Sequence, residues 1–357
     1  MRLFPILAAL ALASPAAAQN VWATKGTQGD YVIKSFKFAS GESLPEVRIH
    51  YTTLGKPRRD AQGIVRNAVL IGHGTGGTGR GFLSPTFAGV LFSPGGILDT
   101  ANYYVILPDG LGHGGSTKPS DGLHAKFPHY DYEDMVRAEY LMVTEGLHVN
   151  HMRLIMGTSM GCMHAWMYGY MYPAFADGLV PLACAPTQIA GRNRMIRRMI
   201  MDDILDSPDY NGGEYTSQPY GLRAAIGQLY IMTSAPRVQQ RQAPTRDKAD
   251  SVIRAYIDSH AKTTDANDMV YYYNASRNYD PSPHLGEITA PVLAINSADD
   301  FVNPPELGLV DTLITRVRGA KFVMLAISDK TRGHGTHSLP AVWGGYLKDF
   351  LATLAER

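Results

Sequence analysis

The strongest constraint on the fold is a series of short apolar runs that alternate with helical patterns. Strands buried on both faces of a parallel sheet have this composition, because helices cover both sides of the sheet. Helical patterns lie at Tyr132–Glu145, Met160–Tyr172 and Val342–Leu354. This alternation predicts an α/β fold with a mostly parallel, doubly wound sheet. The apolar runs are Ala68–Ile71, Tyr103–Leu107, Leu154–Met156, Leu179–Leu182, Pro291–Ile295 and Phe322–Ile327.

Two regions depart from this alternation. Near the N-terminus, Tyr31–Phe38 and Glu46–Thr53 alternate apolar and polar residues, as half-exposed antiparallel strands do. Residues 188–279 show several helical patterns and no convincing buried strand, which predicts a helical cap inserted above the sheet. The predicted catalytic domain therefore comprises residues 19–187 and 280–357.

Residues 1–18 have the layout of a secretory signal peptide. Arg2 is followed by an apolar stretch from Leu3 to Leu12, and the small residues of 16–18 offer a cleavage site between Ala18 and Gln19. The apolar stretch is shorter than the roughly 20 residues of a membrane-spanning helix. We therefore expect a periplasmic or secreted protein, and no later segment predicts a membrane span.

The chain has two cysteines, Cys162 and Cys184. Export would permit a disulfide between them, but the spacing does not decide between a disulfide and two buried thiols. The net charge is +1, so no bulk electrostatic attraction favours nucleic acid. Neither Cys-x-x-Cys nor zinc-finger spacing is present, and we expect neither a metal nor a cofactor. A monomer and a homodimer both remain open.

Gly157-Thr158-Ser159-Met160-Gly161 matches the motif G-x-S-x-G. A predicted strand directly precedes the motif and a predicted helix directly follows it. A serine in such a sharp turn projects its hydroxyl from the sheet edge, and the helix N-terminus favours developing negative charge. We therefore predict Ser159 to be a nucleophile rather than only a helix cap.

A serine nucleophile needs a base and an acid that orients it, and with this motif the chain order is Ser, Asp or Glu, then His. Asp299 and Asp300 both follow a predicted strand, and we prefer Asp300 because it stands four residues before Pro304, where we expect the next helix to start. His334 and His337 both follow the last predicted strand. We prefer His334, which forms a Gly-His pair, and keep Asp299 and His337 as alternatives.

The first parallel strand leads into the glycine-rich loop Gly72-His73-Gly74-Thr75-Gly76-Gly77. Such a loop can direct backbone N–H groups at an oxyanion, and the expected donors are the N–H groups of Thr75 and Met160. The same glycines also fit the dinucleotide fingerprint G-x-G-x-x-G. That interpretation is disfavoured, because the loop continues through Gly81 and Asp99 precedes the next strand instead of ending it.

From about Tyr51 to the C-terminus, the chain resembles the homoserine O-acetyltransferase family of α/β-hydrolases. The motifs that carry the resemblance include the segment around Ser159, Phe127-Pro128 with Asp134-Met135-Val136, and the cap segment Pro208–Tyr215. The resemblance places the catalytic triad on Ser159, Asp300 and His334. It also implies an arginine in the first cap helix that binds the homoserine carboxylate, and Arg197 and Arg198 lie near that position.

The chain departs from this family at Asp109, Glu133 and Ile226, where the family tends to have an asparagine, a basic residue and an arginine. These departures preserve the acyl chemistry and point away from homoserine as the acceptor. We expect an exported serine hydrolase that cleaves a small ester, or less favourably an amide, through an acyl-enzyme. Acyl transfer to a hydroxyl group is the alternative, and a non-catalytic binding module is a third interpretation.

Overall fold

The structure is a computed structural model that describes residues 20–355. The predicted signal peptide of residues 1–18 lies outside the described residues. Within residues 20–355, none of the helices is long and apolar enough to cross a membrane.

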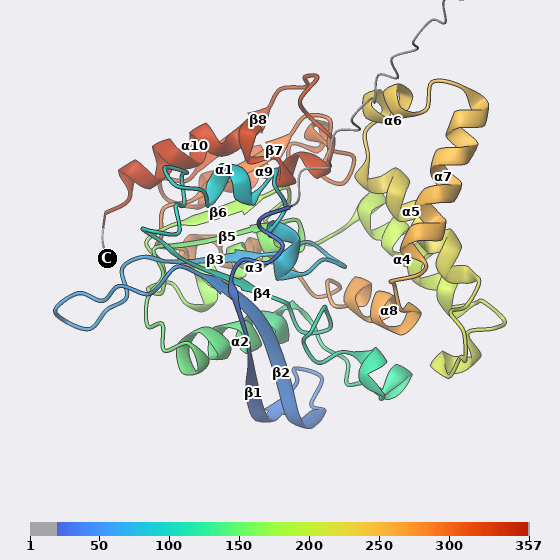
Figure 1. Ribbon diagram of the computed structural model, residues 1–357, viewed down its shortest axis with the longest axis horizontal. Helices are drawn as coiled ribbons and strands as arrows, with labels where there is room; N and C mark the ends of the chain where they lie inside the picture. The colour runs from blue at the N-terminus through green and yellow to red at the C-terminus, as the bar shows by residue number, and fades with distance from the viewer. Residues whose placement is uncertain (1–19, 356–357) are drawn as a thin grey trace, which may run out of the picture.

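An eight-stranded sheet forms the body of the molecule (Figure 1). Its strand order is β1-β2-β4-β3-β5-β6-β7-β8, with antiparallel pairing of β1 with β2 and of β2 with β4, and parallel pairing elsewhere. Each of the eight predicted strands is present, so the predicted fold class is confirmed. Their bounds are β1 Thr27–Lys37, β2 Ser43–Leu54, β3 Ala68–Gly72, β4 Tyr104–Pro108, β5 Leu154–Thr158, β6 Leu179–Leu182, β7 Leu293–Ser297 and β8 Lys321–Leu325.

Helices cover both faces of the sheet and enclose two hydrophobic cores. One core contains residues of α2 (Tyr132–Leu141), α3 (Met160–Met171) and α9 (Leu309–Leu313), including the fully buried Trp166. The other contains residues of α1 (Ala88–Leu91) and α10 (Pro340–Thr353), including the fully buried Trp343. Burial of apolar side chains on both faces accounts for the continuous apolar runs of the central strands.

Three predicted elements differ in detail from the structure. The helix predicted to reach Glu145 changes at residue 142 to one π-helical turn, Met142–Gly146. Pro304 precedes only a short 3₁₀ turn, and the next α-helix, α9, begins at Leu309. The last strand, β8, is not buried on both faces as predicted. It forms the edge of the sheet, so Leu325 is its only buried residue.

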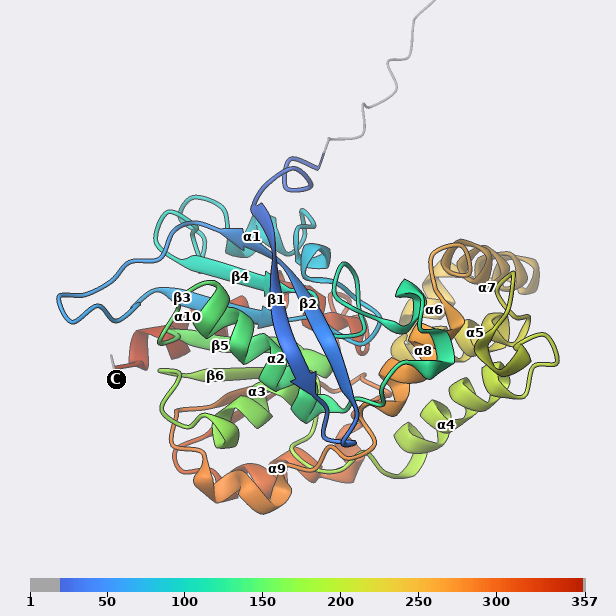
Figure 2. The ribbon, with the colours of Figure 1, turned by 90° about the horizontal axis from the view of Figure 1, so that it is seen from below.

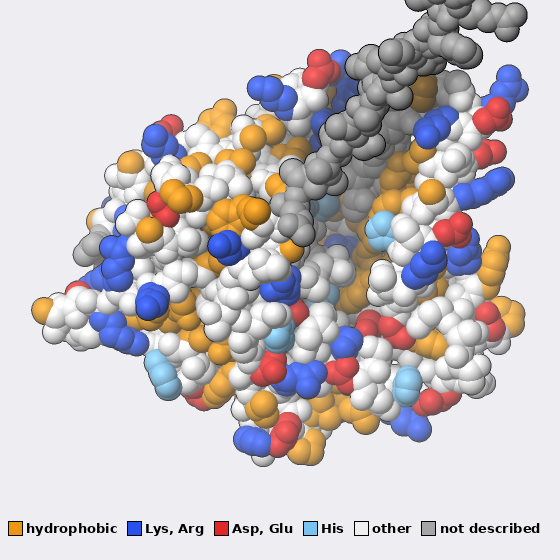
Figure 3. Space-filling view, viewed as in Figure 1, with side chains coloured by type: hydrophobic (Ala, Val, Ile, Leu, Met, Phe, Trp, Pro, Cys, Tyr) orange, Lys and Arg blue, Asp and Glu red, His pale blue; other side chains and the backbone are white. Residues whose placement is uncertain are grey.

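Five helices from residues 191–274 stand at one end of the body, beyond the carboxyl ends of the parallel strands (Figures 1 and 2). They pack around a small core of their own that includes Ile204, Leu222 and Met269. Asp268 links them to the body by accepting hydrogen bonds from the N–H and hydroxyl groups of Ser120 at 2.8 and 2.7 Å. Figure 3 shows the surface hollowed between these helices and the body. The helices are α4 Gly191–Leu205, α5 Gly221–Thr233, α6 Pro236–Gln242, α7 Arg246–His260 and α8 Ala266–Asn274.

Candidate active site

Ser159 occupies the sharp turn between β5 and α3. Its φ of 54° and ψ of −105° place it in a strained backbone conformation. Glycine is required at position 161, because a Cβ atom there would collide with the carbonyl oxygen of Gly72 on β3. The turn is held by the Ser159 N–H, which donates to Leu182 O, and by the Gly161 N–H, which donates to His73 O, both at 2.9 Å. These hydrogen bonds hold the strained turn in place, and the turn positions the Ser159 hydroxyl at the carboxyl edge of the sheet.

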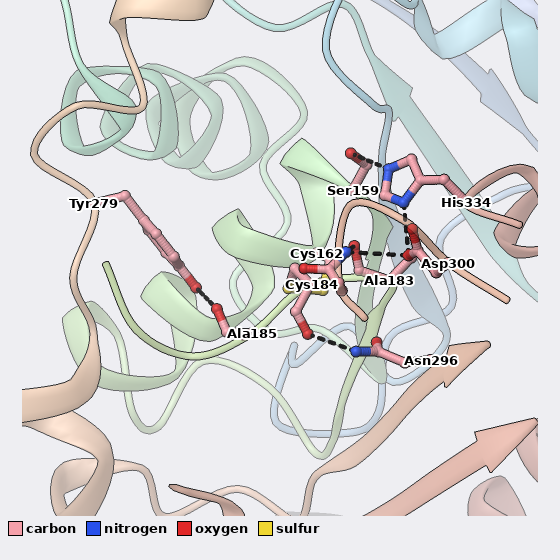
Figure 4. Close-up of a disulfide and its surroundings, with 10 residues drawn as sticks. Ser159, Cys162, Ala183, Cys184, Ala185, Tyr279, Asn296, Asp300 and His334 are labelled. Atoms are coloured by element: carbon pink, nitrogen blue, oxygen red, sulfur yellow. Dashed lines mark hydrogen bonds and ion pairs between the residues drawn. A yellow bond between two sulfur atoms is a disulfide. The ribbon is translucent and has the colours of Figure 1, made fainter. Parts of the chain in front are cut away.

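His334 and Asp300 lie next to Ser159 and form one hydrogen-bonded chain with it (Figure 4). His334 Nε2 is 2.8 Å from Ser159 Oγ, and His334 Nδ1 is 2.8 Å from Asp300 Oδ2. Asp300 follows β7 and His334 follows β8, so the carboxyl ends of neighbouring parallel strands bring the three side chains together. This geometry suits a serine activated by a base that an acid orients.

Asp300 is held as a carboxylate although its side chain is buried. Burial alone would raise its pKa, but the neighbouring His334 and the donors of Asn303 and Val302 outweigh that effect, and the pKa of Asp300 is lowered. The Val302 N–H donates to Oδ1 at 2.7 Å, and Asn303 Nδ2 donates to Oδ2 at 3.1 Å. Asp300 can therefore stabilise a positively charged His334 imidazole.

The two alternative residues lie close by but make different contacts. Asp299 accepts a hydrogen bond from Ser297 Oγ at 2.5 Å within its own loop. His337 packs its ring against His334, with ring centroids 5.1 Å apart, and its Nδ1 is 2.9 Å from Ser338 Oγ. Burial and the charge of His334 lower the pKa of His337 to about 3, so it is neutral at physiological pH. The structure thus connects Asp300 and His334, rather than Asp299 and His337, to Ser159.

The two residues predicted to supply the oxyanion donors lie near Ser159 in the structure. Thr75 lines a cavity together with Ser159 and His334, and Met160 is the first residue of α3. The first N–H groups of a helix have no acceptor within the helix, so the Met160 N–H is available to a ligand. Where a dinucleotide fold would open a helix at Gly77, the loop instead continues to a 3₁₀ turn at Gly79–Phe82.

Two residues for which the sequence predicted no catalytic role, His73 and Asp109, hold this loop in place. His73 Nε2 accepts a hydrogen bond from the Gly110 N–H at 2.9 Å, and its Nδ1 lies 2.8 Å from Gly74 O. Asp109 accepts from the N–H groups of Gly79 at 2.7 Å and Gly115 at 2.8 Å. The position of His73 in the glycine-rich loop was a signal for such a role. For Asp109, the role of holding this loop could be assigned only from the fold.

Two cavities meet at Ser159, and Arg197 and Val302 line both of them. We call the larger one, of about 350 Å³, the wide cavity, which also contains Thr75 and His334. We call the smaller one, of about 70 Å³, the narrow cavity, which lies against the loop that follows β6.

The two arginines predicted to bind substrate are placed differently. Arg197 is 3% exposed, and it donates from Nε to Asn193 Oδ1 at 2.9 Å and from Nη1 to Ser276 Oγ at 3.2 Å. Its guanidinium also lies over the ring of Tyr273. The Arg198 side chain is 60% exposed, pairs with Asp202 and lines neither cavity. Only Arg197 is therefore placed to meet a ligand at Ser159.

The question of the two cysteines is answered by a disulfide between Cys162 and Cys184 (Figure 4). Their Cα atoms are 6.0 Å apart. Cys162 lies in the first turn of α3, and Cys184 lies two residues beyond the end of β6. The disulfide thus joins the helix that carries Ser159 to the loop that leads to the cap helices.

The structure also locates the positions at which the chain departs from the acetyltransferase pattern. Glu133 is exposed on α2, and Ile226 is buried in the core of the cap helices. Neither residue lines a cavity at Ser159. These two substitutions therefore act on the acceptor at most indirectly. Across residues 20–355, no group of three or more His, Cys, Asp or Glu side chains is arranged to hold a metal ion.

An eight-stranded, mostly parallel sheet with a serine at a strained strand–helix turn defines a class of enzymes that carry out hydrolysis or acyl transfer. The chain belongs to the alpha/beta hydrolase family, whose family model matches residues 68–344.

The chain is similar to several known proteins. It is 28% identical to a probable acyltransferase of Methanothermobacter thermautotrophicus, with 78% of this chain and 85% of that protein covered. It is 25% identical to a homoserine O-acetyltransferase of Methanohalophilus mahii, with 78% and 62% covered. Among solved structures, an acetylester hydrolase from Corynebacterium glutamicum superposes with a TM-score of 0.80 at 18% identity, covering 94% of this chain and 99% of that one, which is a likeness of fold. The predicted resemblance to the homoserine O-acetyltransferase branch is confirmed.

Proposed function

We propose that the protein is an exported serine hydrolase that cleaves a small ester through an acyl-enzyme. The observation that carries this proposal is the hydrogen-bonded chain from Ser159 through His334 to Asp300, with the wide cavity open to the Ser159 hydroxyl. Nucleophile, base and orienting acid are each within hydrogen-bond distance of the next group, which is the arrangement that serine nucleophiles require.

In the proposed reaction, Ser159 Oγ attacks the ester carbonyl carbon while His334 Nε2 takes its proton. The N–H groups of Thr75 and Met160 stabilise the oxyanion, and Asp300 stabilises the imidazolium. When the bond to the alcohol oxygen breaks, His334 returns the proton to the leaving alcohol and the acyl group stays on Ser159. Water then attacks the acyl-enzyme by the same route, and the acid is released.

The test is covalent labelling with a fluorophosphonate, together with turnover of a chromogenic acetate ester. Ser159→Ala should abolish labelling and lower turnover by about 10⁴-fold or more, because nucleophile and base act as a unit. Ser259→Ala, an exposed serine on α7 outside both cavities, is the control and should label like the parent protein. Labelling that persists on the Ser159→Ala protein would refute the assignment.

Acyl transfer to a hydroxyl acceptor is the second candidate function. Two observations favour it: the named acetyltransferase and acyltransferase relatives, and the buried Arg197, whose guanidinium lines both cavities and could meet an acceptor carboxylate. Both reactions would share the same acyl-enzyme, so the difference lies in what attacks it. We favour water, because an exported enzyme would be separated from the cytoplasmic acyl-CoA pool that supplies such transferases.

A partition experiment separates the two reactions. The enzyme is given a chromogenic acetate ester with increasing homoserine or glycerol, and free acetate and acetylated acceptor are both measured. Free acetate should dominate at millimolar acceptor. An excess of acetylated acceptor would establish transfer instead and would leave the roles of Ser159, His334 and Asp300 unchanged.

The proposed periplasmic or secreted location has two supports. One is the signal-peptide pattern of residues 1–18, with cleavage between Ala18 and Gln19. The other is the disulfide between Cys162 and Cys184, because structural disulfides persist mainly in oxidising compartments.

A further inference from the structure

The narrow cavity has a chemical environment different from that of the wide cavity, although both reach Ser159. The wide cavity contains His334 and Thr75, whereas the narrow cavity contains neither. Its walls come instead from Met163 of α3, the Ala183–Cys184 segment after β6, and Phe322 of β8. The two cavities are therefore not equivalent for a substrate bound at Ser159.

The geometry of ester cleavage distinguishes their roles. During attack, the carbonyl carbon has four substituents: Ser159 Oγ, the oxyanion, the alcohol oxygen and the acyl chain. The oxyanion must lie at the Thr75 and Met160 N–H groups, and the alcohol oxygen must lie near His334 Nε2 to receive its proton. Thr75 and His334 belong to the wide cavity alone, so the acyl chain is the substituent left for the narrow cavity.

We propose that the narrow cavity is the acyl chamber, and that the disulfide-tethered Ala183–Cys184 wall limits it to short acyl groups. This inference rests on the proposed ester-cleaving function of Ser159. A volume of about 70 Å³ holds on the order of five water-sized groups. An acyl chain of acetyl to butyryl size fits this space, and a hexanoyl chain requires the wall to move.

The wall is held rigidly at several points. Cys184 is tied to α3 by the disulfide, and its carbonyl oxygen accepts a hydrogen bond from Asn296 Nδ2 at 3.2 Å. Ala183 has a φ of 66°, in the left-handed region that is uncommon for alanine, and its carbonyl oxygen accepts from Asn303 Nδ2 at 2.9 Å. Asn303 also donates to Asp300, so the wall is fixed to the same loop that orients His334. Because moving a wall anchored in this way costs free energy, the cavity discriminates between acyl groups by their chain length.

The apolar part of the remaining lining suits an acyl chain, and it lies beside polar side chains that include Asn193, Arg197 and Asn296. Met163, Cys184 and Val310 are buried apolar side chains, and Phe322 and Met324 of the edge strand β8 are half-buried. A mostly apolar pocket of fixed length favours chains that fill it and rejects longer ones by steric overlap.

The experiment compares one substitution in each cavity. Phe322→Ala enlarges the narrow cavity, and Met232→Ala enlarges the wide cavity. Both proteins are assayed for kcat/KM with 4-nitrophenyl acetate, butyrate and hexanoate, in which only the acyl chain varies. They are also assayed with acetate esters of small and bulky alcohols, in which only the alcohol varies.

Phe322→Ala should raise the hexanoate-to-acetate ratio of kcat/KM by about tenfold or more, since a pocket contact is worth that much in discrimination. Met232→Ala should shift the alcohol preference and leave the acyl-length ratio within about twofold. Met324→Phe, a change on the edge strand β8, narrows the same cavity and should lower the butyrate-to-acetate ratio. It provides a second arm if Phe322→Ala does not fold.

Each contrary outcome has a distinct meaning. The acyl chamber is wrongly assigned if Met232→Ala changes the kcat/KM ratio between long-chain and short-chain esters. It is also wrongly assigned if Phe322→Ala and Met324→Phe both fold and neither changes that ratio. A parent protein that turns over none of these esters and is not labelled at Ser159 by a fluorophosphonate would instead refute the proposed function. Ester turnover with labelling at Ser159 but an unchanged chain-length profile refutes only the chamber.

Discussion

Asp299 and Asp300 are adjacent in the chain, yet only one of them can act on His334. Asp300 Oδ2 lies 2.8 Å from His334 Nδ1, whereas Asp299 bonds to Ser297. Asp300→Asn should lower kcat by about 10⁴-fold, because an amide favours the wrong imidazole tautomer and removes the charge that stabilises imidazolium. Asp299→Asn is the matched control and should stay within about tenfold of the parent protein. The measurement is kcat on a chromogenic acetate ester; a larger loss from Asp299→Asn would exchange the two roles.

The two histidines near Ser159 allow a pH prediction. Because the pKa of Asp300 is lowered and that of His337 is about 3, neither group changes charge between pH 5 and 8. Any loss of activity on acidification in that range should therefore come from neither Asp300 nor His337. His337→Gln should leave the acidic limb of the kcat/KM profile in place. A displaced limb in this variant would show that His337 takes part in proton transfer.

Arg197 and Arg198 offer a second matched pair. Arg197 is buried at the junction of the two cavities, and Arg198 is paired with Asp202 at the surface. Arg197→Met should raise KM for a substrate or acceptor that carries a carboxylate by about tenfold to a hundredfold, the worth of one charge-assisted hydrogen bond. Arg198→Met should leave that KM unchanged. Equal effects from both variants would remove Arg197 from the binding site.

These residues show what local sequence can predict about a site. The order of Ser159, Asp300 and His334 follows from motif and strand position, because each lies on the segment that follows a parallel strand. The choice between Arg197 and Arg198 does not, since consecutive residues on a helix point about 100° apart and tertiary packing decides which face is buried. The pairing of Cys162 with Cys184 likewise depends on the approach of α3 to the end of β6.

At the scale of single elements, the disulfide should contribute measurably to stability. It closes a loop of sequence separation 22, for which the loss of unfolded-chain entropy stabilises the fold by about 3 kcal/mol. Cys162→Ala combined with Cys184→Ala should lower the free energy of unfolding by about this amount, measured by denaturant titration. A reducing agent should lower the Tm of the parent protein and not that of the double variant. A parent protein whose Tm ignores reductant would contradict the prediction.

The attachment of α8 to the body should weaken as pH rises. Burial raises the pKa of Asp268 to about 6, although Ser120 donates to it. A folded-state pKa above the unfolded value of 3.8 means that the protonated form stabilises the fold below about pH 4, and that this contribution is lost as pH rises through about 6. As pH rises from 4 to 7, the parent protein should lose this stabilisation and the Asp268→Asn protein should not. The free energy of unfolding of Asp268→Asn should therefore rise by about 1–3 kcal/mol relative to that of the parent protein over this range.

The measurement is the difference in unfolding free energy between Asp268→Asn and the parent protein at several pH values. Asp250→Asn, at an exposed position on α7, is the control and should show no such trend. A difference that stays constant with pH would show that the Asp268 carboxyl is ionised throughout the range.

Element prediction succeeded where the hydrophobic pattern reflects the final burial. Strands β3 to β6 are buried along their whole length, and their apolar runs marked them. Strand β8 has a similar run, yet it lies at the sheet edge with Lys321–Met324 exposed or half-buried. An edge strand with a half-covered face can resemble a central strand in sequence, because its position in the sheet is set by topology rather than by its own residues.

At the scale of the whole molecule, the division between sheet and helices was visible in the sequence. The loss of strand patterns across residues 188–279 corresponds to α4–α8, and the return of the pattern corresponds to β7 and β8. The two cavities were not predictable, because their walls combine the glycine-rich loop, the cap helices and the segment after β7. Pocket shape therefore requires the assembled fold, whereas the reacting groups can be located from strand order.

Export can be tested through the same disulfide that shapes the narrow cavity. If residues 1–18 direct secretion, full-length chain expressed in a bacterial host should be recovered from the periplasm or medium with Gln19 at its N-terminus. That protein should lack free thiols, because Cys162 and Cys184 oxidise outside the cytoplasm. A chain starting at Gln19 after an initiating Met should remain in the cytoplasm and show two reactive thiols after denaturation, with a lower Tm. N-terminal sequencing and thiol titration measure both properties.

Two outcomes would contradict these expectations. Retention of Met1 on a cytoplasmic product would refute export. Active, thiol-reduced cytoplasmic protein with an unchanged Tm would show that the fold does not depend on an oxidising compartment.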